Sequence, residues 1–126
     1  MLKKTFTTPE KYYKHLYFKG KFKVPVNKEK YFYLFHHGFQ LENEIFWTGI
    51  RGEYEGMSLN LWLKLAERSN TIFDVGANTG IYAVSAKGIN PKAKVYAFEP
   101  IKRVYEKLSL NNQINNYDIV CVEKAL

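Results

Sequence analysis

The chain has 126 residues, of which 46% are hydrophobic and 25% charged, and its formal net charge is +7. This length and composition are typical of one globular domain with its own core and exclude a disordered or fibrous chain. No apolar run approaches the roughly 20 residues of a membrane span, and the N-terminus lacks the apolar stretch and cleavage site of a signal peptide. The single cysteine, Cys121, lies in an apolar strand pattern that favours a buried, inert thiol. These features predict a cytoplasmic protein.

The positive charge lies at the start of the chain. Residues 1–30 hold nine lysines and two glutamates, a net charge of +7, whereas residues 31–126 hold ten basic and ten acidic residues. A helix is expected to begin at Pro9 and end at Gly20, with lysines around its tyrosines. Such a surface could bind nucleic acid or anionic lipid. Because charge runs are usually solvated faces, we favour a helix that packs its tyrosines on the domain.

From residue 21 onward the apolar residues recur with a period of two. Phe22, Val24 and Val26 alternate with polar residues, and residues 31–35 form a dense aromatic run. These two segments predict the strands of an antiparallel hairpin. The apolar residues within 39–47 suggest further strands, which would extend the hairpin into a meander.

Two neighbouring histidines, His36 and His37, invite interpretation as metal ligands or as a general base. Adjacent residues of a strand point to opposite faces, so they cannot easily bind one ion together. No further group of Cys and His residues supports a metal site. We therefore interpret both histidines as part of a turn that ends at Gly38, and we predict no metal.

The remainder of the chain alternates between helical and strand patterns. After a glycine-rich loop, Ser58 is expected to cap a helix that runs to about Arg68. Gly88 is expected to end the next helix. The predicted elements that follow the first helix are strand 71–75, helix 80–87, strand 94–98, helix 101–111 and strand 118–122.

This order predicts an α/β fold with a Rossmann-like, doubly wound parallel sheet. The chain would hold the first three strands of that sheet, in spatial order 3-2-1. We expect two regions: a basic and aromatic N-terminal extension with a helix and an antiparallel hairpin or meander over residues 1–56, and the first half of the Rossmann-like domain over residues 57–126.

A glycine-rich turn follows the first of these strands. Asp74 lies near the end of strand 71–75, and Gly76, Asn78 and Gly80 lead into the next helix, where exposed N–H groups make a site for a small ligand. The second strand ends at Glu99, a position from which a carboxylate can accept hydrogen bonds from both hydroxyls of a ribose. Together the two strand ends predict a nucleoside cofactor.

The spacing of the turn narrows the choice of cofactor. A dinucleotide fingerprint would require G-x-G-x-x-G, whereas the sequence 74–80 is similar to motif I of class I S-adenosylmethionine methyltransferases, with Asn78 replacing a glycine. Asn tolerates the left-handed backbone that a glycine would adopt there. With the AFEP segment 97–100, asparagines at the end of the second helix and the closing Ala125-Leu126, residues 45–126 resemble the opening half of an FkbM-type methyltransferase.

The resemblance implies S-adenosylmethionine as the cofactor and, mostly, hydroxyl groups of sugars or metabolites as methyl acceptors. It implies these cofactor-binding residues: Asp74, Gly76, Ala77, Asn78, Gly80, Glu99 and Pro100. Asn78 is also a candidate N-cap for the helix after the turn. In the preceding loop, Glu53 or Glu55 could meet the ammonium group of the cofactor or could be solvated carboxylates, and Arg51 is an equally open candidate.

Two other functions remain open from the sequence: a non-catalytic nucleoside-binding or interaction module, and a fragment of a nucleic-acid methyltransferase that uses residues 1–30 as its basic surface. We consider nucleic acid the less favoured partner. No residue within 1–126 is a candidate catalytic base.

In the family the chain continues beyond the third strand. In a half-sheet of only three strands, strand 71–75 would be an exposed edge although it is the most apolar strand. Either the chain is a fragment of a longer protein or it pairs with another chain along that edge. We therefore expect the 126-residue chain alone to be inactive as a methyltransferase and to be poorly soluble or self-associating, with that edge as the possible contact.

Overall fold

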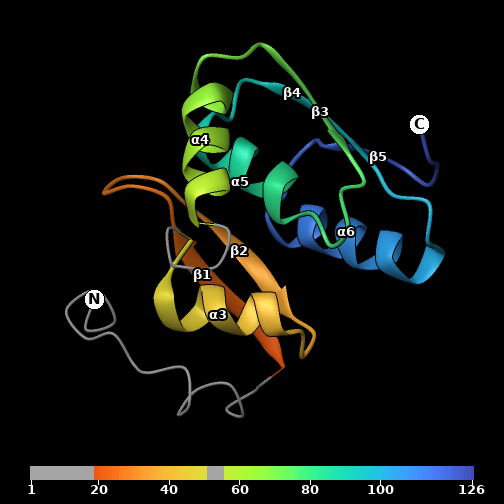
Figure 1. Ribbon diagram of the computed structural model, residues 1–126, viewed down its shortest axis with the longest axis horizontal. Coiled ribbons are helices and arrows are strands. Elements are labelled where there is room, and N and C mark those ends of the chain that lie inside the picture. Colours follow the sequence, from red (N-terminus) through yellow and green to blue (C-terminus); the bar gives the residue numbers. More distant parts are fainter. Residues whose placement is uncertain (1–18, 51–55) are drawn as a thin grey trace.

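The computed structural model describes residues 19–50 and 56–126 (Figure 1). The helix expected from Pro9 and the loop candidates Arg51, Glu53 and Glu55 lie outside the described residues. The chain has an α/β fold with a parallel three-stranded sheet and a separate antiparallel pair of strands. No helix among the described residues is both long and apolar enough to cross a bilayer.

The first two strands form the expected hairpin. β1 (Gly20–Pro25) pairs antiparallel with β2 (Tyr31–His36). The buried side chains of both strands alternate with exposed ones, and Lys21 and Lys23 lie on the outer face. Their Nζ atoms are 4.6 and 4.0 Å from the ring centroids of Tyr33 and Tyr31, so cation–π contacts link the two strands on this face. The hairpin prediction is confirmed.

The strands suggested for residues 39–47 are wrong, because this segment is helix α3 (Gln40–Thr48). The run Glu42-Asn43-Glu44 interrupts the apolar alternation that a half-buried strand requires. Leu41 and Ile45, four residues apart, instead share one side of the helix with Phe46. A nine-residue helix offers little periodicity, which is why its aromatic end resembled a strand.

The parallel sheet has the predicted order. β3 (Thr71–Val75), β4 (Lys94–Phe98) and β5 (Val120–Val122) pair in the order β3-β4-β5, so β3 is an edge strand. Helices α5 (Ile81–Ile89) and α6 (Lys102–Ile114) connect them. Both helices pack against the sheet on one side and against β2 on the other, so they lie between the sheet and the hairpin (Figure 1).

Helix α4 (Gly56–Glu67) precedes the sheet and packs beside α5. The indole Nε1 of Trp62 donates a hydrogen bond of 2.8 Å to the carbonyl of Tyr82 on α5.

Gly88 does not end α5, as the sequence suggested, but lies inside it. A Cβ at Gly88 would be 3.0 Å from Cδ1 of Phe32, so this glycine lets β2 approach the helix closely.

Asn111 in α6 and Asn115, the C-cap of that helix, satisfy the backbone of β2 along the edge that β1 leaves unpaired. The N–H groups of Tyr33 and Phe35 donate to Oδ1 of Asn115 and Asn111, at 2.7 and 2.8 Å. The Asn115 amide also donates to the Tyr33 carbonyl at 2.8 Å. Side chains of a helix thus replace a third strand, and they fix the hairpin against the sheet domain.

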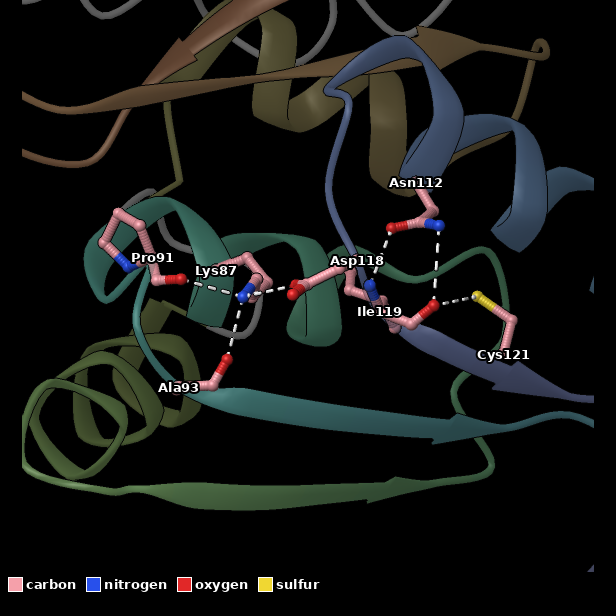
Figure 2. A network of polar contacts seen from close by, with 7 residues as sticks. All are labelled: Lys87, Pro91, Ala93, Asn112, Asp118, Ile119 and Cys121. Carbon is pink, nitrogen blue, oxygen red and sulfur yellow. Dashed lines mark hydrogen bonds and ion pairs between the residues drawn. The ribbon is translucent and has the colours of Figure 1, made fainter.

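A buried lysine joins α5 to the segments around it. Figure 2 shows that the ammonium group of Lys87 donates to the carbonyls of Pro91 and Ala93, both at 2.8 Å, and pairs with Asp118 at 2.6 Å. In the same network Cys121 is half-buried, and burial raises its thiol pKa to about 11. The expected inert thiol is consistent with that protonated state.

We expect Asn115→Ala to lower the free energy of unfolding by roughly 1–3 kcal/mol, because it leaves backbone groups of Tyr33 without partners. The midpoint of urea denaturation measures the loss. Gln113→Ala is the matched control on the exposed side of α6, where the change should stay within about 0.5 kcal/mol. Equal midpoints for the two variants would contradict the proposed role of Asn115.

Candidate functional site

The glycine-rich turn is held against the end of β4. The N–H groups of Gly76 and Ala77 both donate to the carbonyl of Phe98, at 2.9 and 2.8 Å. Gly76, Asn78 and Gly80 have φ angles of 73°, 54° and 94°. The turn therefore needs the left-handed conformation at each of its three small residues, and Asn78 adopts it as expected.

Gly80 has a packing role that the sequence did not reveal. It is the N-cap of α5, and no side chain caps this helix, so Asn78 is not the N-cap that we expected. A Cβ at Gly80 would lie 2.5 Å from Cδ1 of Leu108. Glycine at this position lets α6 pack closely against the start of α5.

Glu99 connects the two strand ends. The residue is only 6% exposed. Oε1 accepts the N–H of Asn78 at 2.9 Å, and Oε2 accepts the N–H of Ile101 at 3.0 Å. The predicted proximity of the turn and the second strand end is therefore present. Each carboxylate oxygen can accept a further hydrogen bond, so Glu99 can brace the turn and still bind a hydroxyl group.

Asp74 lies below the turn with one oxygen unpaired. Its Oδ2 is buried and has no hydrogen-bond partner among the described residues. Burial raises the pKa of Asp74 to about 6, against the opposing effect of a hydrogen bond from the backbone N–H of Ala83. A buried carboxylate with a raised pKa beside a glycine turn is typical of a ligand site.

The turn also leaves room for a ligand. A Cβ built on Gly76 would meet no atom within 4 Å. Pro100 is exposed directly after Glu99, whereas the side chain of Ala77 is buried in the core. Only the backbone of Ala77 therefore belongs to the turn. Open space, a buried carboxylate and a glycine turn at one end of the sheet fit a nucleoside with free hydroxyl groups.

Asn111 of α6 supports the turn through the Thr79 carbonyl, a role that the sequence analysis did not predict. Its amide donates to the carbonyl of Thr79 at 2.7 Å, while its Oδ1 holds the N–H of Phe35. One side chain thus connects the turn to the hairpin. A fully buried asparagine in the apolar stripe of a predicted helix is the feature that could have pointed to it.

His36 is not a turn residue, because it ends β2 and is fully buried. Its Nδ1 accepts the N–H of Gly38 at 3.0 Å, and its Nε2 lies 3.3 Å from Oδ1 of Asn43. Burial lowers its pKa, which favours the neutral ring. His37 does lie in the turn, and its N–H donates to Glu42 at 2.8 Å. Among the described residues no group of three or more His, Cys, Asp or Glu could hold a metal ion.

Comparison with known proteins gives a match in structure only. No family model matches the chain, and no curated protein sequence matches it. Its structure is similar to the crystal structure of a SAM-dependent methyltransferase from Agrobacterium tumefaciens, with a TM-score of 0.55 and 10% identity over 86% of this chain and 33% of that one. A protein-L-isoaspartate O-methyltransferase aligns over 95% of this chain and 33% of its own, at 16% identity and a TM-score of 0.44.

The chain therefore spans about a third of the length of these two structures. At such low identity the first likeness establishes the fold alone: the chain has part of the α/β fold of SAM-dependent methyltransferases. Nothing in these comparisons bears on the individual site residues or on the narrower FkbM-type resemblance.

We expect Asp74→Asn to raise the free energy of unfolding at pH 7. The Asp74 pKa is about 6 in the folded chain, above its usual value near 4. The folded state then holds a proton that the unfolded state has lost, so stability falls as the pH rises through this window. Relative to that of the variant, the free energy of unfolding of the native chain should fall by roughly 1–3 kcal/mol between pH 4 and pH 7. Urea denaturation at each pH measures the change.

Asp118→Asn is a control with the opposite sign. The hydrogen bond from Lys87 lowers the pKa of the exposed Asp118, so its contribution to stability is present at neutral pH and is lost as the pH falls through that lowered pKa. A difference in the free energy of unfolding between Asp74→Asn and the native chain that stays constant with pH would contradict the raised pKa of the buried Asp74 carboxyl.

Proposed function

We propose that the chain is the cofactor-binding part of an S-adenosylmethionine-dependent methyltransferase of the FkbM type. The observation that carries the proposal is the meeting of two strand ends, where Glu99 lies against an open turn at Gly76. Residues 57–126 would bind the cofactor, and the hairpin of β1 and β2 within residues 1–56 would brace them through contacts of the kind that Asn111 and Asn115 make. The methyl acceptor would be a hydroxyl group of a sugar or a small metabolite.

Four of the proposed binding residues have distinct tasks. Glu99 would accept hydrogen bonds from the ribose hydroxyls with the lone pairs that the backbone leaves free. The open side of Gly76 would admit the methionine part, which carries no phosphate and needs no pyrophosphate site. Pro100 would border the nucleoside, and the buried oxygen of Asp74 would gain a partner at the same end of the sheet.

The bound cofactor supplies an activated methyl group on its sulfonium sulfur. The chain would hold the nucleoside in place, and orientation alone can lower a barrier by about 7–11 kcal/mol. Transfer to a hydroxyl group also needs an acceptor for its proton. Among the described residues we assign no group to that task, so the proposal concerns binding and orientation.

Calorimetric titration of the 126-residue chain tests the proposal. We expect it to bind S-adenosylmethionine in preference to NAD, which needs a pyrophosphate site. Glu99→Gln should weaken binding by roughly 1–3 kcal/mol because it removes a charged acceptor for the ribose. Glu123→Gln, at an exposed glutamate after β5, is the matched control and should bind like the native chain.

Gly76→Ala separates a binding effect from a folding effect. Its methyl group would meet no protein atom, so the variant should fold with a strain of about 1–2 kcal/mol in the left-handed turn. The same methyl group would occupy the space assigned to the cofactor and should weaken binding. Unchanged affinity in both Glu99→Gln and Gly76→Ala, or a preference for NAD, would refute the proposed site.

A further inference from the structure

A buried carboxyl group lies where the hairpin meets α3, in segment 36–42, which we call the hairpin junction. Glu42, in the first turn of α3, is 2% exposed. Its Oε2 accepts the N–H of His37 at 2.8 Å, whereas its Oε1 is buried and has no hydrogen-bond partner among the described residues. An ionised carboxylate removed from water needs partners for both oxygens. The surroundings of Glu42 therefore suit the neutral acid better than the charged one.

Two histidines of the junction are also arranged as neutral groups. Nδ1 of the fully buried His36 accepts the N–H of Gly38, which it can do only while it carries no proton. Nε2 of His37 is buried and has no hydrogen-bond partner in the part of the chain that the structure describes. Neither ring is therefore held as a cation that would neutralise a charged Glu42.

Positive charge reaches the junction from α6 and from the residue before β1. Lys107 of α6 lies over the ring of Phe39, with its Nζ 4.9 Å from the ring centroid. Burial raises the pKa of Glu42 to about 7, against the opposing effects of the His37 hydrogen bond and the Lys107 charge. Burial, followed by the charge of Lys107, lowers the pKa of His37, and Lys19 acts in the same direction. The charges around the junction thus keep His37 neutral and compensate a charged Glu42 only in part.

The junction is linked to the glycine-rich turn through one side chain. Phe35 directly precedes the junction, and its N–H donates to Oδ1 of Asn111 at 2.8 Å. The amide of the same asparagine donates to the Thr79 carbonyl, within the turn, at 2.7 Å. Opening of the end of β2 would therefore release Asn111 from one of the two segments that it joins.

We propose that the hairpin junction is a pH-sensitive brace on the glycine-rich turn. It is closed while Glu42 is neutral, and it opens locally when the carboxyl group loses its proton, because a charge with one unpartnered oxygen is then left in the interior. The opening frees the end of β2 from Asn111 and loosens the turn. This is a property of the chain without ligand, so it does not depend on which molecule the turn binds.

The direction of the pH effect follows from the state in which Glu42 holds its proton. Its pKa is about 7 in the closed junction, above its ordinary value of 4.5. The advantage of the closed state is therefore complete below pH 4.5 and is lost as the pH rises to about 7. His36 acts in the opposite direction, because burial lowers its pKa and its contribution is lost as the pH falls. A comparison at each pH with a chain that lacks only the Glu42 charge separates the two effects.

Amide hydrogen exchange of the 126-residue chain, followed by NMR across this pH range, tests the proposal. The protection factor of the Phe35 N–H reports on the brace, and that of the Gly80 N–H, which donates to Ala77, reports on the turn. Relative to Glu42→Gln, which is neutral at every pH, the protection of Phe35 should fall on the order of a hundredfold as the pH rises to about 7. The protection of Gly80 should fall over the same range.

Two controls isolate the effect of Glu42. Glu106→Gln removes an exposed glutamate of α6 and should follow the native chain. Asp74 also titrates beside the turn, so the comparison is made between chains that carry Asp74→Asn. Equal protection of Phe35 with and without Glu42→Gln at every pH would overturn the proposal, and so would a change at Phe35 that does not reach Gly80.

The carbon-13 resonance of the Glu42 carboxyl group gives a second measurement, which needs no variant. It should titrate with a midpoint near 7. Lys107→Met should raise this midpoint, because it removes a charge that favours the ionised carboxylate. A midpoint near the ordinary value of 4.5 would overturn the proposal.

Discussion

The whole site depends on one buried carboxylate. Glu99 accepts a hydrogen bond from each of two chain segments, the turn at Asn78 and the start of α6 at Ile101. Without an acceptor, these backbone N–H groups would be unsatisfied next to a left-handed turn. Glu99 therefore acts with the Phe98 carbonyl, which accepts the N–H groups of Gly76 and Ala77, to hold the turn after β3 against the end of β4.

Support for the site extends through the helical layer to the hairpin. Asn111 holds the carbonyl of Thr79 and the N–H of Phe35, and Asn115 holds both backbone groups of Tyr33. Gly88 and Gly80 allow the two close approaches that these bonds require. The N-terminal hairpin is thus part of the structure that positions the turn, and it is not a separate attachment to it.

The sequence predicted the parts of the structure that depend on local pattern. The bounds of β3 and β4 were correct because short apolar runs bordered by a glycine turn and by Glu99-Pro100 leave little choice. Helix α3 was missed because it is only nine residues long, so its apolar residues do not repeat often enough to show helical periodicity. Asn78 lies 21 residues from Glu99, and Phe35 lies 76 residues from Asn111, so no local pattern could show these contacts.

The reactivity of the buried Lys87 amine can report on local opening of the fold. Its ammonium group has three N–H donors, and two carbonyls and a carboxylate occupy them in the folded chain. The amine is therefore shielded from solvent while α5, the loop at Pro91 and the segment before β5 stay together. Reagents that acylate free amines can reach it only when that junction opens, so the rate of its acylation is a direct measure of local opening next to the sheet.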